Sequence, residues 1–337
     1  MVYRRGHIRG GARDALVFGA WVRAKVEDVR TGHSDSADEH SRFIDETGRC
    51  YTSIGEIGRG VLTTVAMAEA VTVPASRECV AIKTVLPLWI GHPLAEARIS
   101  RERELSALLH ADGEVFDNAR IVAGGQQRFA DGRSRPFHVS AFLHGTSLSE
   151  RMKASRVASL SVRSALRWTD DVLRALCRLH RCGWVHRDVK PQNIFLEKNE
   201  DGDPCATLID YGLAVRIGSE GHEQDGDEPF GTPAYVSPEV IACATLDARA
   251  DLYSVGLVLF ELLCGVRPFP GRDPIALLEA HLAEPAPSVK MHKPELSSQL
   301  EGLINATLAK SPGDRPDSAE MFRSQLARCP EGQHLLS

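Results

Sequence analysis

The stretch "GWVHRDVKPQNIF", residues 183–195, places a histidine, an arginine, an aspartate, a lysine and an asparagine between apolar flanks. A surface loop needs no hydrophobic supports such as Trp184 and Phe195, and a buried strand cannot hold that many charges without partners. The pattern therefore predicts a loop that lies between buried elements and presents an acid, a cation and an amide at a site.

Composition limits the class of protein. The chain has 337 residues, of which 43% are hydrophobic and 25% charged, enough for one large domain or two lobes. A formal net charge of −5 gives no reason to expect a nucleic acid or an anionic membrane as partner. The eight cysteines are scattered without a C-x-x-C pair, so we expect reduced thiols and a cytoplasmic location. The most apolar run, residues 252–266, is too short to span a membrane and contains Glu261, which favours a buried core helix.

The hydrophobic pattern of the sequence changes along the chain. Residues 1–48 show no sustained period and are expected to be a loosely ordered extension. Short apolar runs broken by glycine and proline follow, with one helical pattern over 94–110, and helical patterns then dominate. The order predicts an α+β fold with a small antiparallel-sheet lobe, one main helix in it, and a larger helical lobe. The expected ranges are about 51–140 for the first lobe, about 145–328 for the second and 329–337 for a short tail.

Two strand ends deliver polar side chains to one place. Asn193 precedes the strand "IFLE", and Asp210 ends the apolar strand "ATLID". Both offer hard oxygen ligands, which suit Mg²⁺ better than zinc. Asp188 could accept a proton from a hydroxyl, and Lys190 could neutralise charge that develops between this hydroxyl and a transferred group. H-R-D alone is weak evidence, since a solvated charge cluster is the default, but the ordered set H-R-D-x-K-x-x-N, strand, D-Y-G is specific.

These motifs, in this order, resemble those of the eukaryotic-type (Hanks-type) protein kinase family. The catalytic loop corresponds to residues 186–193, the V-A-I-K strand to 80–83, D-F-G to D-Y-G at 210–212 and A-P-E to S-P-E at 237–239. The likeness covers about residues 51–328 and is closest in character to bacterial members. It implies a two-lobed kinase fold, an ion pair between Arg315 and Glu239, and an Asp251 that caps the buried central helix.

The resemblance implies ATP and Mg²⁺ as cofactors, with Asn193 and Asp210 as metal ligands. Lys83 should hold the α- and β-phosphates and be held in turn by a glutamate of the 94–110 helix. Glu102 and Glu104 are both candidates. Glu104 is favoured because apolar residues follow it at i+1, i+4 and i+7, as they do in the family.

The nucleotide pocket departs from the family in two places. Thr63 replaces the third glycine of the glycine loop, which should stiffen that loop. Ser140 stands at the gatekeeper position beside Ala141, where an acid is usual, so we expect an enlarged pocket behind adenine and recognition of adenine by backbone groups. The residues expected to bind the nucleotide are Ile57, Gly58, Arg59, Gly60, Val65, Ala81, Lys83, Ala141, Leu143 and Asp210.

Lys190 and the "GTPAY" segment resemble the serine/threonine-specific branch, so the expected partner is a protein with a serine or threonine acceptor. Catalysis is expected from Asp188, Lys190, Asn193, Lys83 and Glu104. A pseudokinase or scaffold, and a small-molecule phosphotransferase, remain as alternatives. In the acidic segment before "GTPAY", Asp227 or Glu228 is expected to take the place of an activating phosphate and to pair with Arg187, unless the segment is simply a solvated acidic loop. No feature of the sequence indicates an oligomeric state.

Overall fold

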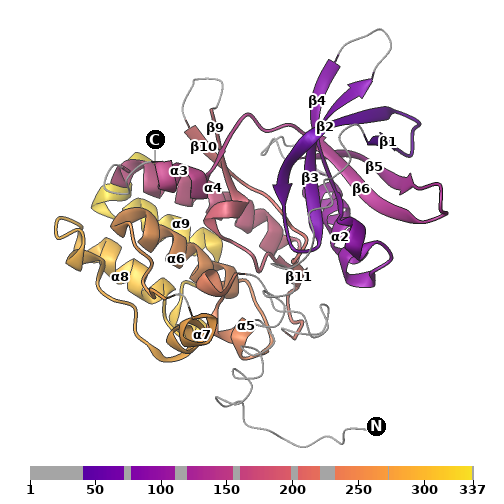
Figure 1. The fold of residues 1–337 in the computed structure, drawn as a ribbon. Coiled ribbons are helices and arrows are strands. Elements are labelled where there is room, and N and C mark those ends of the chain that lie inside the picture. Colours follow the sequence, from indigo (N-terminus) through magenta and orange to yellow (C-terminus); the bar gives the residue numbers. More distant parts are fainter. Residues whose placement is uncertain are drawn as a thin grey trace, which may run out of the picture.

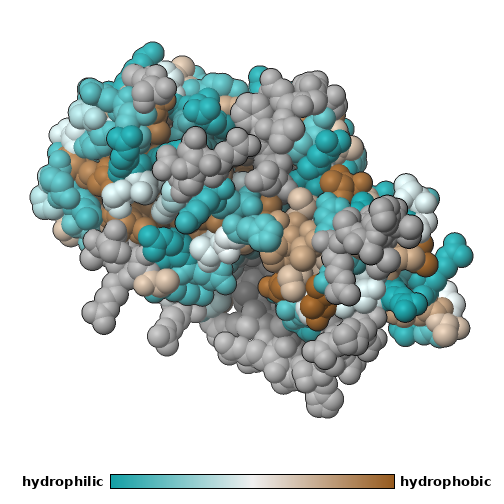
Figure 2. All heavy atoms as spheres, turned by 90° about the horizontal axis from the view of Figure 1, so that it is seen from above, coloured by the Kyte–Doolittle hydropathy of each residue, from teal (hydrophilic) through white to brown (hydrophobic). Residues whose placement is uncertain are grey.

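Two lobes follow one another along the chain (Figure 1). The computed structural model describes residues 41–71, 77–110, 120–154, 160–198, 204–220, 232–271 and 273–335. A strand-rich lobe comes first and a helical lobe second, so the predicted α+β class, with a sheet lobe and a helical lobe, is confirmed. On the face seen in Figure 2, hydrophilic residues predominate and apolar residues appear in small separate groups.

The first lobe contains a six-stranded antiparallel sheet in the order β1-β2-β3-β4-β6-β5. Its strands are β1 (Arg42–Ile44), β2 (Cys50–Arg59), β3 (Thr63–Val71), β4 (Arg77–Val85), β5 (Ile121–Arg128) and β6 (Ser134–Ala141). Alternate residues of β3 and β4, among them Ala68, Val80 and Ile82, are buried, which is the period-two pattern of a sheet with one covered face. Helix α2 (Pro93–Leu109) packs on this sheet through Ala95 and Ile99, which cluster with Val85 of β4.

Strand β1 lies inside the segment that was expected to be loosely ordered. Residues 1–40 lie outside the described residues. From residue 42 to residue 48 the expectation is wrong, because residues 42–44 pair with β2 and a buried carboxylate fixes the turn after them. Asp45 accepts hydrogen bonds from the backbone and hydroxyl of Thr47, from the Arg49 backbone and from the Tyr51 hydroxyl. Side-chain and backbone donors outweigh the effect of burial and lower the pKa of Asp45. The sequence alone could not predict β1, since this three-residue strand depends on its pairing with β2.

The same segment joins the two ends of the sheet. The Glu46 backbone N–H donates to the carbonyl of Gly124 in β5 at 3.1 Å, and the Gln127 side chain donates to the Arg42 carbonyl at 3.2 Å. Arg103 of α2 also pairs with Glu46 at 2.7 Å. The sheet therefore curls until its first and last strands lie against each other.

The second lobe is built around a buried helix, α6 (Arg249–Cys264), which confirms the core helix predicted from its apolar run. It ends at Gly265, whose φ of 78° is the left-handed conformation that glycine adopts without strain. Around it are α3 (Leu148–Ala154), α4 (Val162–Arg181), α5 (Pro238–Ile241), α7 (Pro274–Ala283), α8 (Ser298–Thr307) and α9 (Ala319–Arg328). In the ranges described above, no helix has the length and apolarity needed to cross a membrane.

Two small sheets contain the strands on either side of residues 186–193. One consists of β7 (Gly145–Ser147), β9 (Ile194–Lys198) and β10 (Pro204–Leu208), and the other of β8 (Trp184–Val185) and β11 (Val215–Arg216). A Cβ on Gly145 would lie 1.9 Å from the Leu196 carbonyl oxygen, so only glycine allows β7 to approach β9 this closely. Within the stretch 183–195, residues 186–193 thus lie between β8 and β9, as the apolar flanks predict.

Candidate active site

A cavity of about 590 Å³ opens between the lobes. It is lined by residues of the sheet, of α2, of the connection after β6 and of the end of β10. Of the residues predicted to bind a nucleotide, those that line it are Ile57, Val65, Ala81, Lys83, Ala141, Leu143 and Asp210. Gly58, Arg59 and Gly60 are not among the lining residues. The guanidinium of Arg59 instead pairs with Glu56 through two contacts of 2.8 Å.

Lys83 of β4 lies at the inner end of the cavity. Its Nζ is 2.6 Å from Oε1 of Glu102 and 2.7 Å from Oδ1 of Asp210. Burial alone would lower the pKa of Lys83, but the two carboxylates outweigh it and raise that pKa. Burial likewise acts to raise the pKa of Asp210, whereas Lys83 holds it well below its usual range. At neutral pH the site therefore contains a charged lysine beside the ionised carboxylate of Asp210.

The glutamate that pairs with Lys83 is Glu102, so the prediction of Glu104 is wrong. Glu102 is 5% exposed, while the Glu104 side chain is 61% exposed and lies 3.9 Å from the guanidinium of Arg216. The apolar pattern after Glu104 was misleading, because Leu108 at i+4 is itself 40% exposed. The buried face of α2 instead consists of Ala95, Ile99, Glu102, Leu105 and Ser106, which follow one another at helical spacing.

His138 is a site residue that the sequence analysis missed. Its Nε2 lies 3.0 Å from Oε2 of Glu102, and the ring lines the cavity. In the β4–β6 pairing His138 lies directly opposite Lys83, so both side chains project from the same face. The available signal was a titratable residue within a strand otherwise expected to be buried, two positions before the small residue Ser140.

Three residues of the catalytic loop, Asp188, Lys190 and Asn193, are joined by hydrogen bonds to the Asp188 carboxylate. Lys190 Nζ lies 2.9 and 2.7 Å from the two carboxylate oxygens of Asp188. Asn193 donates through Nδ2 to the Asp188 carbonyl at 3.0 Å and to its carboxylate at 2.8 Å. The Asn193 carbonyl in turn accepts from the backbone N–H of Ile209, the residue before Asp210. These contacts tie the loop to the strand that carries Asp210.

Two residues of the site adopt a left-handed backbone that is uncommon for residues other than glycine. Arg187 and Asp210 both have φ of 67°. Such conformations cost about 1–3 kcal/mol and persist where the surroundings enforce them. For Arg187 the enforcing group is Asp251 of α6, whose carboxylate accepts the backbone N–H groups of His186 and Arg187 at 2.8 Å each. The expectation that Asp251 caps α6 is therefore wrong: the residue before that helix is Ala248, with no side-chain cap, and Asp251 bonds the loop.

Gly212 of the D-Y-G motif allows α2 to approach the end of β10. A Cβ at this position would lie 2.7 Å from Oε1 of Glu102, the oxygen that pairs with Lys83. Arg101 of α2 donates to the Gly212 carbonyl at 3.0 Å. The preceding aromatic ring, Tyr211, packs against His186 with ring centroids 5.0 Å apart. Burial lowers the pKa of His186, so this ring is neutral at pH 7.

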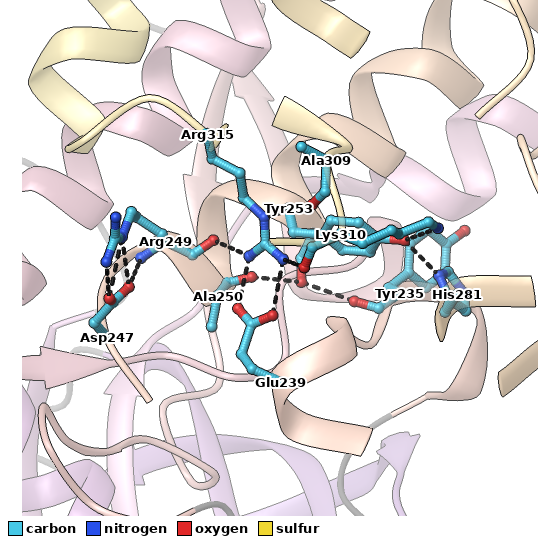
Figure 3. Close-up of polar contacts among 11 residues, drawn as sticks. Tyr235, Glu239, Asp247, Arg249, Ala250, Tyr253, His281, Ala309, Lys310 and Arg315 are labelled. Carbon is cyan, nitrogen blue, oxygen red and sulfur yellow. Dashed lines mark hydrogen bonds and ion pairs between the residues drawn. The ribbon is translucent and has the colours of Figure 1, made fainter. Parts of the chain in front are cut away.

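A second buried ion pair joins Arg315 and Glu239 in the helical lobe (Figure 3). Arg315 contacts the Glu239 carboxylate with both terminal nitrogens, at 2.6 and 2.8 Å, as the resemblance implied. The guanidinium also donates to three backbone carbonyls, those of Arg249, Ala309 and Lys310. The acidic segment that contains Asp227 and Glu228 lies outside the described residues.

The donor set fits a magnesium ion. Asn193 uses its amide nitrogen on Asp188, which leaves the amide oxygen as the atom that it can offer to a cation. Asp210 stays ionised because Lys83 lowers its pKa. Amide and carboxylate oxygens are the hard ligands that Mg²⁺ prefers, and it usually takes only one or two carboxylates from a protein.

Comparisons with known proteins agree with this geometry. Residues 51–326 match the family model described as "Protein kinase domain". PknJ of Mycobacterium tuberculosis, named a serine/threonine-protein kinase, is 34% identical over 274 residues, which are 80% of this chain and 44% of that protein. The probable serine/threonine-protein kinase SCO3848 of Streptomyces coelicolor is 32% identical over 257 residues, 75% of this chain and 36% of that protein. The chain thus spans less than half the length of these relatives.

A solved structure shares the fold. The kinase domain of PknI from Mycobacterium tuberculosis, crystallised as a double mutant, superposes with a TM-score of 0.59 at 23% identity. The match covers 82% of this chain and 94% of that one.

Proposed function

Since the chain belongs to the protein kinase family, we propose that it transfers the γ-phosphoryl group of ATP to serine or threonine hydroxyls of protein substrates. The observation that carries the proposal is the assembly of Lys83, Glu102 and Asp210 at the inner end of the cavity, with Asp188, Lys190 and Asn193 joined in the adjacent loop. Phosphoryl transfer depends mainly on positioning and on charge neutralisation, and these are the groups that supply both. A scaffold that only binds partners has no need of all of them.

The nucleotide would occupy the cavity between the lobes. Val65 and Ala81 offer apolar surface for the adenine, and backbone groups of Ala141 and Leu143 line the same space. The small side chain of Ser140 leaves room behind the base. Lys83, which contacts Asp210 in this structure, would turn one of its donors to the phosphates while Glu102 keeps it in place.

Asp188 is the proposed acceptor of the substrate hydroxyl proton. Lys190 and Asn193 both donate to its carboxylate, which orients the side chain towards the site. Lys190 also lies where it can neutralise charge on the oxygen that attacks. Mg²⁺ held by Asn193 and Asp210 would supply charge neutralisation along the phosphate chain.

Serine or threonine as acceptor is supported by Lys190 and by the names of the relatives, which are serine/threonine-protein kinases. The test is incubation with γ-labelled ATP, Mg²⁺ and a generic protein substrate, followed by phosphoamino-acid analysis. We expect label in phosphoserine or phosphothreonine, and none above background with the Asp188→Asn variant. Nucleotide binding without any transfer would identify a scaffold instead, and label confined to small molecules would identify a small-molecule phosphotransferase.

A further inference from the structure

The contact between His138 and Glu102 has no part in the proposed roles above. His138 is 5% exposed, and it belongs to β6, which runs beside the strand that carries Lys83. Its Nε2 lies 3.0 Å from Oε2 of Glu102, the carboxylate oxygen that Lys83 does not use. The two oxygens of Glu102 are thus divided between a lysine on β4 and a histidine on β6.

This division matters because Glu102 is buried. A carboxylate oxygen that is removed from bulk water and lacks a hydrogen-bond donor costs free energy, so each oxygen of Glu102 is more stable with a donor from the protein. Lys83 is a shared donor, since Asp210 lies 2.7 Å from the same Nζ. Under the proposed function Lys83 must also engage phosphates, whereas His138 is not called on to bind a nucleotide phosphate. His138 is therefore a donor to Glu102 that nucleotide binding leaves in place.

The ring needs only one proton for this task. When Nε2 carries the proton, it donates to Glu102, and Nδ1 is left as an acceptor. Nδ1 is buried, and among the described residues it has no hydrogen-bond partner. The tautomer with its proton on Nε2 therefore suits the geometry, because Nε2 faces an acceptor in Glu102 and Nδ1 faces none among the described residues.

We propose that His138 is a positioning residue for the kinase reaction, which holds Glu102, and with it helix α2, in the inward position that orients Lys83. It does so whether or not a nucleotide is bound, so the site is arranged before ATP enters. The inference rests on the proposed function for its catalytic meaning, but the geometric statement about α2 can be tested without catalysis.

If His138 served only to pack the sheet, the leucine variant would behave differently. Leucine at position 138 would fill a similar volume among the apolar residues of the sheet and would keep the fold. It would leave Oε2 of Glu102 without its donor, and the carboxylate would relieve this by turning away or by moving α2 outward. Activity and stability should therefore separate in His138→Leu, while a residue that serves only to pack the core would affect both together.

The experiment compares His138→Leu with His138→Gln, whose side-chain amide can donate at nearly the same place. His292→Leu is the surface control, since His292 is an exposed residue of the helical lobe whose ring lies against Phe260. We expect His138→Leu to lower kcat about tenfold to 100-fold, the loss typical of a hydrogen bond to a charged group. Its unfolding midpoint should stay near that of the wild type, and His138→Gln should recover most of the activity.

Two further measurements complete the test. In a Glu102→Gln background, His138→Leu should cause little additional loss, because the contact it removes no longer involves a charge. In the protein without nucleotide, amide hydrogen exchange across α2 (Pro93–Leu109) should rise in His138→Leu and not in His292→Leu. The exchange measurement needs no turnover, so failure of the proposed function and failure of this inference are distinguishable.

Unchanged kcat and unchanged exchange in His138→Leu would overturn the inference. So would a loss of activity that parallels a loss of stability and is not recovered by His138→Gln, since His138 would then serve only to pack the sheet.

Discussion

The carboxylate of Asp251 accepts the backbone N–H of Arg187 at 2.8 Å, which joins the core helix α6 to the catalytic loop. Its other oxygen accepts the backbone N–H of His186 and lies 2.8 Å from Nε2 of His180. Burial acts to raise the pKa of Asp251, but these donors and the histidines lower it overall. A side chain that never reaches the cavity therefore determines the backbone conformation beside Asp188.

Asp251→Asn should impair both stability and turnover. The amide keeps the shape of the side chain but replaces one acceptor by a donor, which faces a backbone N–H. We expect a loss of about 1–3 kcal/mol in the free energy of unfolding, from one unsatisfied buried group. Denaturant unfolding and kcat measure the two effects. Asp131→Asn, at an exposed loop, is the control, and equal behaviour of both variants would contradict the assigned role.

Glu102→Gln and Glu104→Gln should differ sharply in activity. Glu102 forms a buried ion pair with Lys83, and loss of one partner of such a pair costs about 3–5 kcal/mol. We therefore expect kcat/KM to fall by at least about tenfold in Glu102→Gln. Glu104 is exposed, where ion pairs contribute about 0–1 kcal/mol, so its variant should resemble the wild type. Steady-state kinetics of the two variants is the measurement. An inactive Glu104→Gln beside an active Glu102→Gln would refute the assignment of Glu102 as the partner of Lys83.

Arg315→Lys should destabilise the helical lobe despite keeping the charge. The guanidinium contacts Glu239 with two nitrogens and donates to three carbonyls, a geometry that an ammonium cannot reproduce (Figure 3). Arg315→Ala should cost more, about 3–5 kcal/mol, because it leaves the Glu239 charge buried alone. Adding Glu239→Gln to Arg315→Ala should restore part of the loss. Denaturant unfolding of the three variants is the measurement, and full stability of Arg315→Lys would show that charge alone suffices.

His281 should make stability depend on pH. It is fully buried between Tyr253 and Phe269, its Nδ1 lies 3.0 Å from the Tyr253 hydroxyl, and Lys310 contributes a nearby positive charge. Burial, followed by Lys310, lowers the pKa of His281 to about 4 from its ordinary value of 6.5. The carbonyls of Pro233 and Ala234 act in the opposite direction.

Because the folded pKa of His281 is depressed, the unfolded chain binds a proton more readily than the folded one. This contribution to stability is complete above pH 6.5 and is lost as the pH falls from 6.5 towards 4, by up to about 3 kcal/mol. The free energy of unfolding of the wild type minus that of His281→Gln should therefore decline over this range. A flat difference curve would mean that His281 titrates alike in both states.

The catalytic loop and the D-Y-G strand could be predicted because their residue types are rare in combination and their spacing is short. The choice of Glu102 as the partner of Lys83 could not be predicted, because the buried face of α2 includes the polar residue Ser106. Ser106, at i+4 from Glu102, is buried since its hydroxyl accepts the backbone N–H of Ile121. That partner lies 15 residues away, and a count of apolar positions on the helix therefore favours Glu104. His138 was missed for a similar reason, since only the pairing of β4 with β6 places it opposite Lys83.

The short strand Arg42–Ile44 also bears on how copies of this protein behave towards one another. A sheet edge with free backbone donors and acceptors is a template on which a strand of another molecule can form. Here β1 covers one edge of β2, and the turn after it bonds to Gly124 in the strand at the opposite edge. Residues 42–46 touch none of the proposed catalytic groups. By covering this edge of β2, they protect the small lobe against aggregation through pairing of sheet edges.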